Sequence, residues 1–408
     1  MLFLLTLISI SAQQIDWKKY IEHLRKGLPA CHINLFAVKD SLAFNKGLEK
    51  IEVQCEKHTD FEIAVMLQQL IAGFGDSHTS VQWYEMADTN QIIPVKIYWF
   101  KEGLYILQTT VSNEKVLGKK VIAINDMPVR QVCDSLMTLV TADNNAIIKS
   151  LIPRLMIYGE LYRHFGNSAD ANVVFTVIDE NGDSIKTEIV SETISDANRV
   201  SFKPDSVSFN WQHSSDFFSN RYSESDSIFY ILYNKCWSRE IEKKYGNKDL
   251  AKEMPSFKQF EASVLKDIKN KPVKKLIFDL SFNGGGNSAP GSAFIKKLSA
   301  IEKVNRTGKL YVVIGRYTFS SAIINAMDFK ENTHAIFVGE ETGGKPNHFG
   351  EVRCLTLPAS GMNVCYSTKY FKHTEEDLNT IHPDVYIEAS FQDFKKGIDP
   401  VYEWIKEN

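Results

Sequence analysis

The sequence predicts an α/β protein built from three folded parts. Residues 227–408 alternate short apolar runs with stretches of helical periodicity, a pattern typical of parallel strands joined by helices. Residues 13–90 carry apolar residues at helical spacing, and residues 91–195 combine several short strands with one or two helices. We therefore expect an N-terminal helical domain, an α+β module and an α/β core domain, with residues 196–226 as a polar connector before the core.

The individual elements follow from the same patterns. The first part predicts helices at 15–28 and 59–74. The second part predicts strands at 92–100, 103–111 and 119–126, a helix at 129–140 and a hairpin at 172–190. In the core we expect Ser256 as a helix N-cap, strands at 227–234, 274–280, 309–315 and 334–340, and helices at 256–270, 289–301, 320–330 and 394–407.

The composition is that of a globular protein and argues against several classes of partner. The chain has 408 residues, of which 44% are hydrophobic, and a net charge of −3. There is no basic block and no zinc-finger spacing, so we expect no nucleic-acid partner. Neither a Cys/His metal spacing nor a phosphate-loop or dinucleotide motif is present, so we expect no metal and no cofactor. The oligomeric state stays open.

The first twelve residues, MLFLLTLISISA, are apolar and end in small residues, as in a signal peptide cleaved after Ala12. A frayed apolar N-terminus is the alternative. The run is too short to span a bilayer, so we expect an exported protein, periplasmic or extracellular, without a membrane span. Cys354 and Cys365 flank an expected hairpin that turns at Ala359–Ser360, where they could form a cross-strand disulfide or remain buried free thiols.

Two features of the core domain are typical of catalytic sites. The segment Asn283–Asn287, NGGGN, follows a predicted buried strand, and its glycines allow a sharp turn that presents backbone N–H groups. A plain tight turn is the alternative. Ser320 and Ser321 lie between a predicted strand and a predicted helix, whose N-terminus would stabilise an oxyanion. The alternative is that the serine only caps the helix.

A serine nucleophile needs a base, and two residues qualify. Lys345 follows a strand that comes directly after the helix of Ser320, so the fold can return it to the serine. A lysine acts as a base only when it is neutral, which burial favours. His78 lies at a predicted domain junction, and histidines titrate near neutrality without help. A surface lysine and a hydrogen-bonded structural histidine are the plain alternatives.

These segments together resemble the carboxy-terminal processing peptidases, or tail-specific proteases, with their tricorn and interphotoreceptor retinoid-binding relatives. The matching segments are LIFDLSFNGGGNS, the stretch from Tyr317 to Glu351, LTLPASGMNVCYSTKYF, GFGDSHTS and HPDVYIE. The resemblance covers roughly residues 60–405 and is strongest at 274–370. It implies a crotonase-like (ClpP/crotonase) core, with the second part as a PDZ-like domain that binds peptide by strand addition.

The resemblance also implies the roles of individual residues. The processing enzymes place a lysine 25 residues after the nucleophile, which here makes Ser320 the nucleophile and Lys345 the base. The Ser321 N–H and the loop at Gly284 and Gly285 would form the oxyanion hole. The implied function is a serine endopeptidase that hydrolyses unfolded or tail-exposed polypeptides through an acyl-enzyme. The alternative is a non-catalytic ligand- or peptide-binding protein on the same scaffold.

Tricorn-like members of the group use a different base. They have a histidine preceded by a serine, which the pair Ser77–His78 resembles, and an acid for which Glu340 and Glu341 are candidates. The sequence also departs from the usual pattern at two positions. Ser281 stands where an arginine is usual, and Ile323 stands where an acidic residue is usual, so both positions could weaken or retune catalysis.

Overall fold

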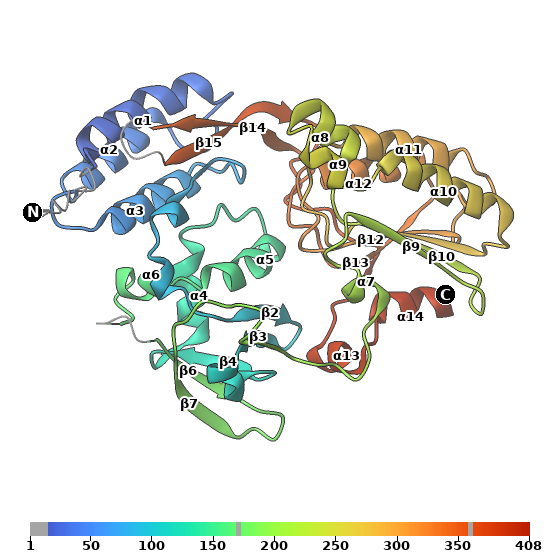
Figure 1. Cartoon of the computed structure of the whole chain (residues 1–408). Coiled ribbons are helices and arrows are strands. Elements are labelled where there is room, and N and C mark those ends of the chain that lie inside the picture. The colour runs from blue at the N-terminus through green and yellow to red at the C-terminus, as the bar shows by residue number, and fades with distance from the viewer. Residues whose placement is uncertain (1–14, 169–172, 358–361) are drawn as a thin grey trace, which may run out of the picture. The chain divides into compact units, whose positions relative to one another are not determined.

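The computed structural model describes residues 15–168, 173–357 and 362–408. The chain divides into two compact units, one made of residues 1–87 and 350–369 and the other of residues 88–349 and 370–408 (Figure 1). The expected signal peptide at residues 1–12 and the expected turn at Ala359–Ser360 lie outside the described residues.

The first unit packs three helices with a small sheet. Helix α3 begins with a capping box, in which Thr59 and Glu62 each bond the backbone N–H of the other. The helices predicted at 15–28 and 59–74 are confirmed by α1 and α3. The elements are α1 (Trp17–Cys31), α2 (Ser41–Glu52) and α3 (Asp60–Ala72), with strands β1 (Ser80–Val81), β15 (Asn363–Phe371) and β14 (His348–Thr356) paired in that order.

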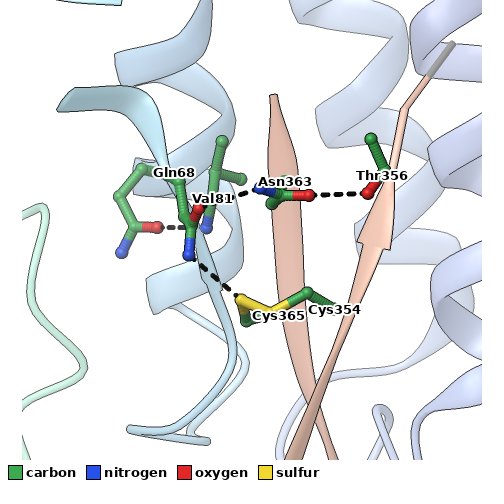
Figure 2. Close-up of a disulfide and its surroundings, with 7 residues drawn as sticks. Gln68, Val81, Cys354, Thr356, Asn363 and Cys365 are labelled. Atoms are coloured by element: carbon green, nitrogen blue, oxygen red, sulfur yellow. Dashed lines mark hydrogen bonds between the residues drawn. A yellow bond between two sulfur atoms is a disulfide. The ribbon is translucent and has the colours of Figure 1, made fainter. Parts of the chain in front are cut away.

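A disulfide joins the two long strands of this sheet (Figure 2). Cys354 on β14 is bonded to Cys365 on β15, which settles the choice between a disulfide and free thiols that the sequence left open. The Gln82 side-chain amide donates to Cys365 Sγ at 3.2 Å, and Thr356 donates to Asn363 at 2.8 Å on the same hairpin. The remaining cysteines carry free thiols.

The second unit begins with a mixed module of strands and short helices. Its predicted strands, its helix and its hairpin are confirmed, and helices α5 and α6 are additional to the prediction. The sheet has the order β2-β3-β4-β6-β7, with β5 beside β4 and β8 beside β3. The elements are β2 (Lys96–Phe100), β3 (Gly103–Thr110), β4 (Lys120–Ile124), β5 (Met127–Pro128), α4 (Val129–Met137), α5 (Asn145–Leu155), α6 (Gly159–His164), β6 (Val173–Ile178), β7 (Ser184–Ile189) and β8 (Arg199–Ser201).

The rest of the second unit is an α/β core around a six-stranded sheet, of which the α/β pattern and four strands were predicted. The strands are parallel except for β9, which pairs antiparallel with β10. The expected connector at 196–226 contains β8, α7 and β9; the sequence of β9, FSNRYS, is too polar to be recognised as a strand. The sheet order is β16 (Val385–Tyr386), β13 (Ile336–Gly339), β12 (Leu310–Ile314), β11 (Lys275–Asp279), β10 (Ile228–Tyr233) and β9 (Phe218–Ser223).

Helices cover both faces of this sheet, so its central strands are buried on both sides (Figure 1). Phe229 and Phe278 face the core beneath α10–α12, whereas Tyr230 and Ile277 face α14. Ser256 caps α10 by accepting the Gln259 N–H, as predicted. The helices are α7 (Phe209–Gln212), α8 (Arg239–Tyr245), α9 (Leu250–Glu253), α10 (Phe257–Asn270), α11 (Ala289–Ser299), α12 (Ser321–Asn332), α13 (Phe391–Lys396) and α14 (Pro400–Glu407).

The single helix predicted at 394–407 is wrong in one respect, because two helices occupy this segment. α13 ends at Lys396, and Gly397 follows in the left-handed conformation with φ +67°, which ends a helix without strain. Pro400 then opens α14, with Asp399 as its N-cap. The helical spacing of apolar residues continues across residues 397–399, so the sequence pattern did not indicate that the helix ends there.

Candidate active site

Ser320 occupies a sharp turn between β12 and α12. Its backbone has φ +55° and ψ −125°, a region that residues other than glycine rarely adopt. As the N-cap of α12, it makes no side-chain hydrogen bond to the first turn of the helix. A strained serine between a strand and a helix, with its hydroxyl not used for capping, is the placement known from nucleophile elbows.

The neighbouring serine has a different role. The Ser321 hydroxyl donates to the Gly286 carbonyl at 2.7 Å, and its residue is buried. This bond ties the first turn of α12 to the glycine loop. The two adjacent serines of the sequence are therefore distinguished by their contacts, because one hydroxyl holds the loop and the other does not cap the helix.

The glycine loop lies directly against Ser320. Gly285 has φ +104°, and a Cβ atom placed on it would lie 2.8 Å from Ser320 Cβ and 3.0 Å from the Phe319 carbonyl oxygen. Atoms that are not bonded to each other do not approach so closely, so both the conformation and the contact require glycine here. Gly284 differs, because a Cβ atom on it would meet nothing within 4 Å.

The backbone N–H groups beside Ser320 are not equally available. The Gly285 N–H donates to the Asn283 side-chain oxygen at 2.9 Å, so this group is engaged within the loop. By contrast, within the described part of the chain the N–H groups of Gly284 and Ser321 make no hydrogen bond. Ser321 is also the first residue of α12, where the helix dipole favours negative charge.

The turn that carries Lys345 packs beside the serine turn. The Gly344 N–H donates to the Thr318 carbonyl at 3.2 Å, and a Cβ atom on Gly344 would lie 3.0 Å from Ile323 and 3.1 Å from Phe319. Residues on both sides of Ser320 thus contact the residue before Lys345. The unusual Ile323 is fully buried and forms part of this contact.

The Lys345 ammonium has two acidic neighbours. Its Nζ lies 3.8 Å from Asp143 Oδ1 and 3.9 Å from Asp377 Oδ2. Lys345 therefore lies near the serine turn, as the sequence order suggested, with two carboxylates within 4 Å of its ammonium.

Asn144 anchors the Lys345 turn and was not anticipated from the sequence. Its side-chain amide donates to the carbonyls of Thr342, at 3.1 Å, and Asn379, at 2.7 Å. The partners are 198 and 235 residues away along the chain, so no local pattern could reveal the contact. Asn144 is also the N-cap of α5, which fixes the position of its side chain.

His78 belongs to the first unit, whereas Ser320 belongs to the second. The His78 Nδ1 lies 4.0 Å from Asp76 Oδ1, and the His78 backbone N–H donates to the same carboxylate at 2.9 Å. Burial alone would raise the pKa of Asp76, but hydrogen bonds, including those from His32 and Thr79, outweigh burial and hold the pKa at about 2. His78 is thus paired with a carboxylate that is ionised at neutral pH.

The two glutamates considered as an acid partner have other partners in the structure. Glu340 accepts two bonds from Arg316, at 2.6 and 2.8 Å, and Glu341 pairs with His382 at 3.1 Å. Arg316 is 2% exposed and also bonds Glu388 at 2.8 Å. Glu340 therefore balances the charge of a buried guanidinium.

Ser281, the second departure from the usual pattern, begins the glycine loop. Its N–H donates to Asp279 Oδ1 at 2.7 Å, and Tyr230 donates to the other oxygen of the same carboxylate at 2.6 Å. The Tyr230 hydroxyl also lies 3.4 Å from Asp399. Burial, reinforced by the charge of Asp279, raises the pKa of Asp399 to about 6.

Comparison with known proteins identifies this region. Residues 252–387 match the model of Peptidase family S41, and the match includes the glycine loop, Ser320 and Lys345. This segment is a peptidase S41 domain. The predicted relationship to the processing peptidases and the predicted enzyme class, a serine-type peptidase, are thereby confirmed. No curated protein sequence is significantly similar to the chain.

Solved structures of CPAF support the same fold. Mature CPAF matches with a TM-score of 0.62 at 12% identity, over 95% of both chains, and CPAF complexed with lactacystin matches with 0.62 at 11%, over 96% of this chain and 97% of that one. The photosystem II D1 C-terminal processing protease matches with a TM-score of 0.39 at 13% identity, over 95% of this chain and 99% of that one. At such identities the CPAF likeness shows a shared mixed α/β fold.

Two further features bear on the class of site. Among residues 15–168, 173–357 and 362–408, no group of His, Cys, Asp and Glu side chains could hold a metal ion. Within the same described ranges, the helices are too short or too polar to cross a membrane.

Proposed function

We propose that the chain is a serine endopeptidase in which Ser320 attacks the peptide carbonyl and forms an acyl-enzyme, which water then hydrolyses. The observation that carries the proposal is the turn at Ser320, with φ +55°, a hydroxyl that does not cap α12, and Gly285 directly against it. Backbone strain of this kind costs about 1–3 kcal/mol and persists where the surrounding structure enforces it.

The oxyanion hole in this proposal consists of the Gly284 and Ser321 N–H groups. Both are free of other hydrogen bonds among the described residues, and Ser321 adds the positive end of the α12 dipole. The Gly285 N–H, also expected from the sequence as a donor, is bonded to Asn283, so Gly285 serves as the close contact with Ser320.

For the base we propose Lys345, with His78 as the alternative. Lys345 lies in the same unit as Ser320 and follows Gly344, whose N–H donates to the Thr318 carbonyl at 3.2 Å. The nearest acid to His78 is Asp76, whose Oδ1 lies 4.0 Å from His78 Nδ1. Substitution of each residue decides between the two assignments.

The finer architecture is also a proposal. We take residues 227–408, apart from the segment 350–369 that belongs to the first unit, as a crotonase-like core, residues 91–195 as a PDZ-like domain and residues 13–90 as a helical domain. Strands β2 and β7 are the ends of the sheet path in the 91–195 module, where a peptide could add as a further strand. This arrangement suits unfolded or tail-exposed polypeptides as substrates.

We further propose that the protein is exported. The apolar run at residues 2–10 ends in small residues, and the Cys354–Cys365 disulfide is typical of an oxidising compartment. N-terminal sequencing of the protein from a secreting host tests this, because cleavage after Ala12 should leave Gln13 as the first residue.

Hydrolysis of fluorescently labelled casein tests the function. Wild type should release fluorescence and Ser320→Ala should not, whereas Ser299→Ala, a serine on α11 whose hydroxyl donates to the Lys296 carbonyl, should match wild type. Lys345→Ala should abolish the activity and His78→Ala should retain it, whereas the reverse result would assign the base to His78. Equal inactivity of wild type and Ser320→Ala from pH 6 to 10 would overturn the proposal in favour of a binding protein on the same scaffold.

A further inference from the structure

Asn283 lies beneath the glycine loop and is fully buried. Its side-chain oxygen accepts the Gly285 N–H at 2.9 Å, and its side-chain amide donates to the Tyr233 carbonyl, at the end of β10, at 2.7 Å. The Cys236 thiol also lies 3.5 Å from the same oxygen. One side chain therefore ties the loop to the rigid end of a central strand.

The backbone of Asn283 reaches the serine turn as well. Its carbonyl accepts the Phe319 N–H at 3.0 Å, from the residue immediately before Ser320, and its own N–H donates to Leu280 at 2.9 Å. Among the contacts of the described chain, Asn283 thus links the loop that carries Gly284 with the turn that carries the nucleophile. Movement of either segment would strain the same residue.

The hydrogen bond from the Gly285 N–H to the Asn283 side chain orients the backbone of the glycine loop. Asn283 holds the Gly285 N–H and so fixes the peptide before Gly285, whereas the Cys236 N–H, which donates to the Gly285 carbonyl at 3.0 Å, holds the peptide after it. The Gly284 N–H makes no hydrogen bond within the described chain. Without the amide, the peptide before Gly285 could rotate and a donor could turn away from Ser320. The glycines themselves offer no resistance, since they lack side chains.

We propose that Asn283 is a positioning residue of the oxyanion hole: its side chain sets the orientation of the loop N–H groups relative to Ser320. This inference rests on the proposed function. The side chain of Asn283 would affect the stabilisation of the transition state and not the binding of substrate. Asn283 is buried and does not face solvent, so it acts through the loop and makes no contact with substrate.

Asn283→Ala tests the proposal, with Asn234→Ala as the matched control. Asn234 is also buried, at 2% exposed, and its amide donates to the carbonyls of His213, at 2.9 Å, and Asp216, at 3.1 Å, neither of which belongs to the glycine loop, although Asn234 follows Tyr233 in the chain. Both variants lose a buried amide bound to backbone carbonyls. Only Asn283→Ala loses the link to the glycine loop, so the difference in kcat between the two variants separates an effect on positioning from an effect on stability.

Casein hydrolysis by Asn283→Ala should lose about 100- to 1,000-fold in kcat, the loss seen when an oxyanion donor is removed, with KM within about threefold of wild type. The midpoints of its pH profile should stay unchanged, because the base is untouched. Asn234→Ala should keep kcat within about threefold. An equal loss in both variants, or a loss confined to KM, would overturn the proposal.

A second substitution covers the case in which Asn283→Ala does not fold. Asn283→Ser keeps a short acceptor for the N–H two residues on, although a weaker one, so kcat should fall by only about tenfold. Undiminished kcat in a folded Asn283→Ser would also contradict the proposal. Failure of the peptidase function itself is separate, because it would appear as inactivity of wild type and as equal inactivity of Ser320→Ala.

Discussion

Replacement of Gly285 by alanine should abolish most of the activity at a modest loss of stability. The added methyl carbon would lie 2.8 Å from Ser320 Cβ, whereas carbon atoms in contact are about 3.5–4.0 Å apart, so the loop or the serine must move by roughly 1 Å. The residue must also keep φ +104°, which costs a residue with a side chain about 1–3 kcal/mol.

A shift of this size misaligns the N–H groups of the loop with the developing oxyanion. The loss of one such donor lowers kcat about 10²- to 10³-fold, which corresponds to about 2.7–4 kcal/mol of transition-state stabilisation. Gly285→Ala should therefore lose about that much in kcat for labelled casein. Urea unfolding should show a loss of about 1–3 kcal/mol, which leaves the protein folded.

Gly182→Ala is the matched control for backbone strain. Gly182 has φ +86°, and a Cβ atom on it meets nothing within 4 Å, so its substitution adds the strain of a left-handed residue without a clash. It should lose stability to a similar extent and keep full activity. If Gly285→Ala retained kcat within a few-fold of Gly182→Ala, the assignment of the glycine loop to the oxyanion hole would be refuted.

Three further outcomes can be measured by urea unfolding. Arg316→Met leaves Glu340 without its cation, whereas Glu388 keeps Lys149 at 2.6 Å, and should cost about 3–5 kcal/mol. The pKa of Asp399 is raised to about 6, so its stabilising contribution is complete below pH 3.8 and is lost as pH rises through 6; Asp399→Asn should lack this loss, which amounts to about 3 kcal/mol. Conversion of both Cys354 and Cys365 to serine opens a loop with a sequence separation of 11 and should cost about 3 kcal/mol under non-reducing conditions.

Each of these three expectations has a result that would contradict it. A loss below 1 kcal/mol in Arg316→Met would mean that water reaches its glutamates. An unchanged difference between wild type and Asp399→Asn at pH 4.5 and 7.5 would place the titration of Asp399 outside this window. Equal stability of the oxidised wild type and the double cysteine variant would show that the hairpin is already fixed by its strand pairing.

Much of the core could be predicted from local sequence, because its signals are local. The run IFYILY at 228–233 is apolar at every position and buried at every position, as expected of a parallel strand covered on both faces. Ser256 predicted the start of α10 because serine is a preferred N-cap residue. The segment around Ser320 could be recognised because its order and spacing repeat those of a peptidase family.

Features that depend on contacts between distant segments of the chain could not be predicted from the sequence. The polar segment β9 forms a strand because it pairs with β10 at the edge of the sheet. Its own residues show no apolar alternation that would predict a strand. The acids beside Lys345 come from other parts of the chain, so the sequence showed a lysine at the right spacing without showing its two acidic neighbours. Periodicity likewise could not show that Gly397 separates two helices.

The amino-acid sequence placed Ser320 at the start of a helix after one predicted strand and the glycine loop after another, and the spacing to Lys345, through the family resemblance, selected Ser320 as the nucleophile. The contacts that distinguish the two serines arose only in the folded chain, where the Ser321 hydroxyl reaches the Gly286 carbonyl and Ser320 takes a strained backbone. The same holds for the Gly285 N–H, which Asn283 engages. The physical reason is that hydrogen bonds and backbone strain depend on where distant segments pack, whereas strands, helices and caps depend on neighbouring residues.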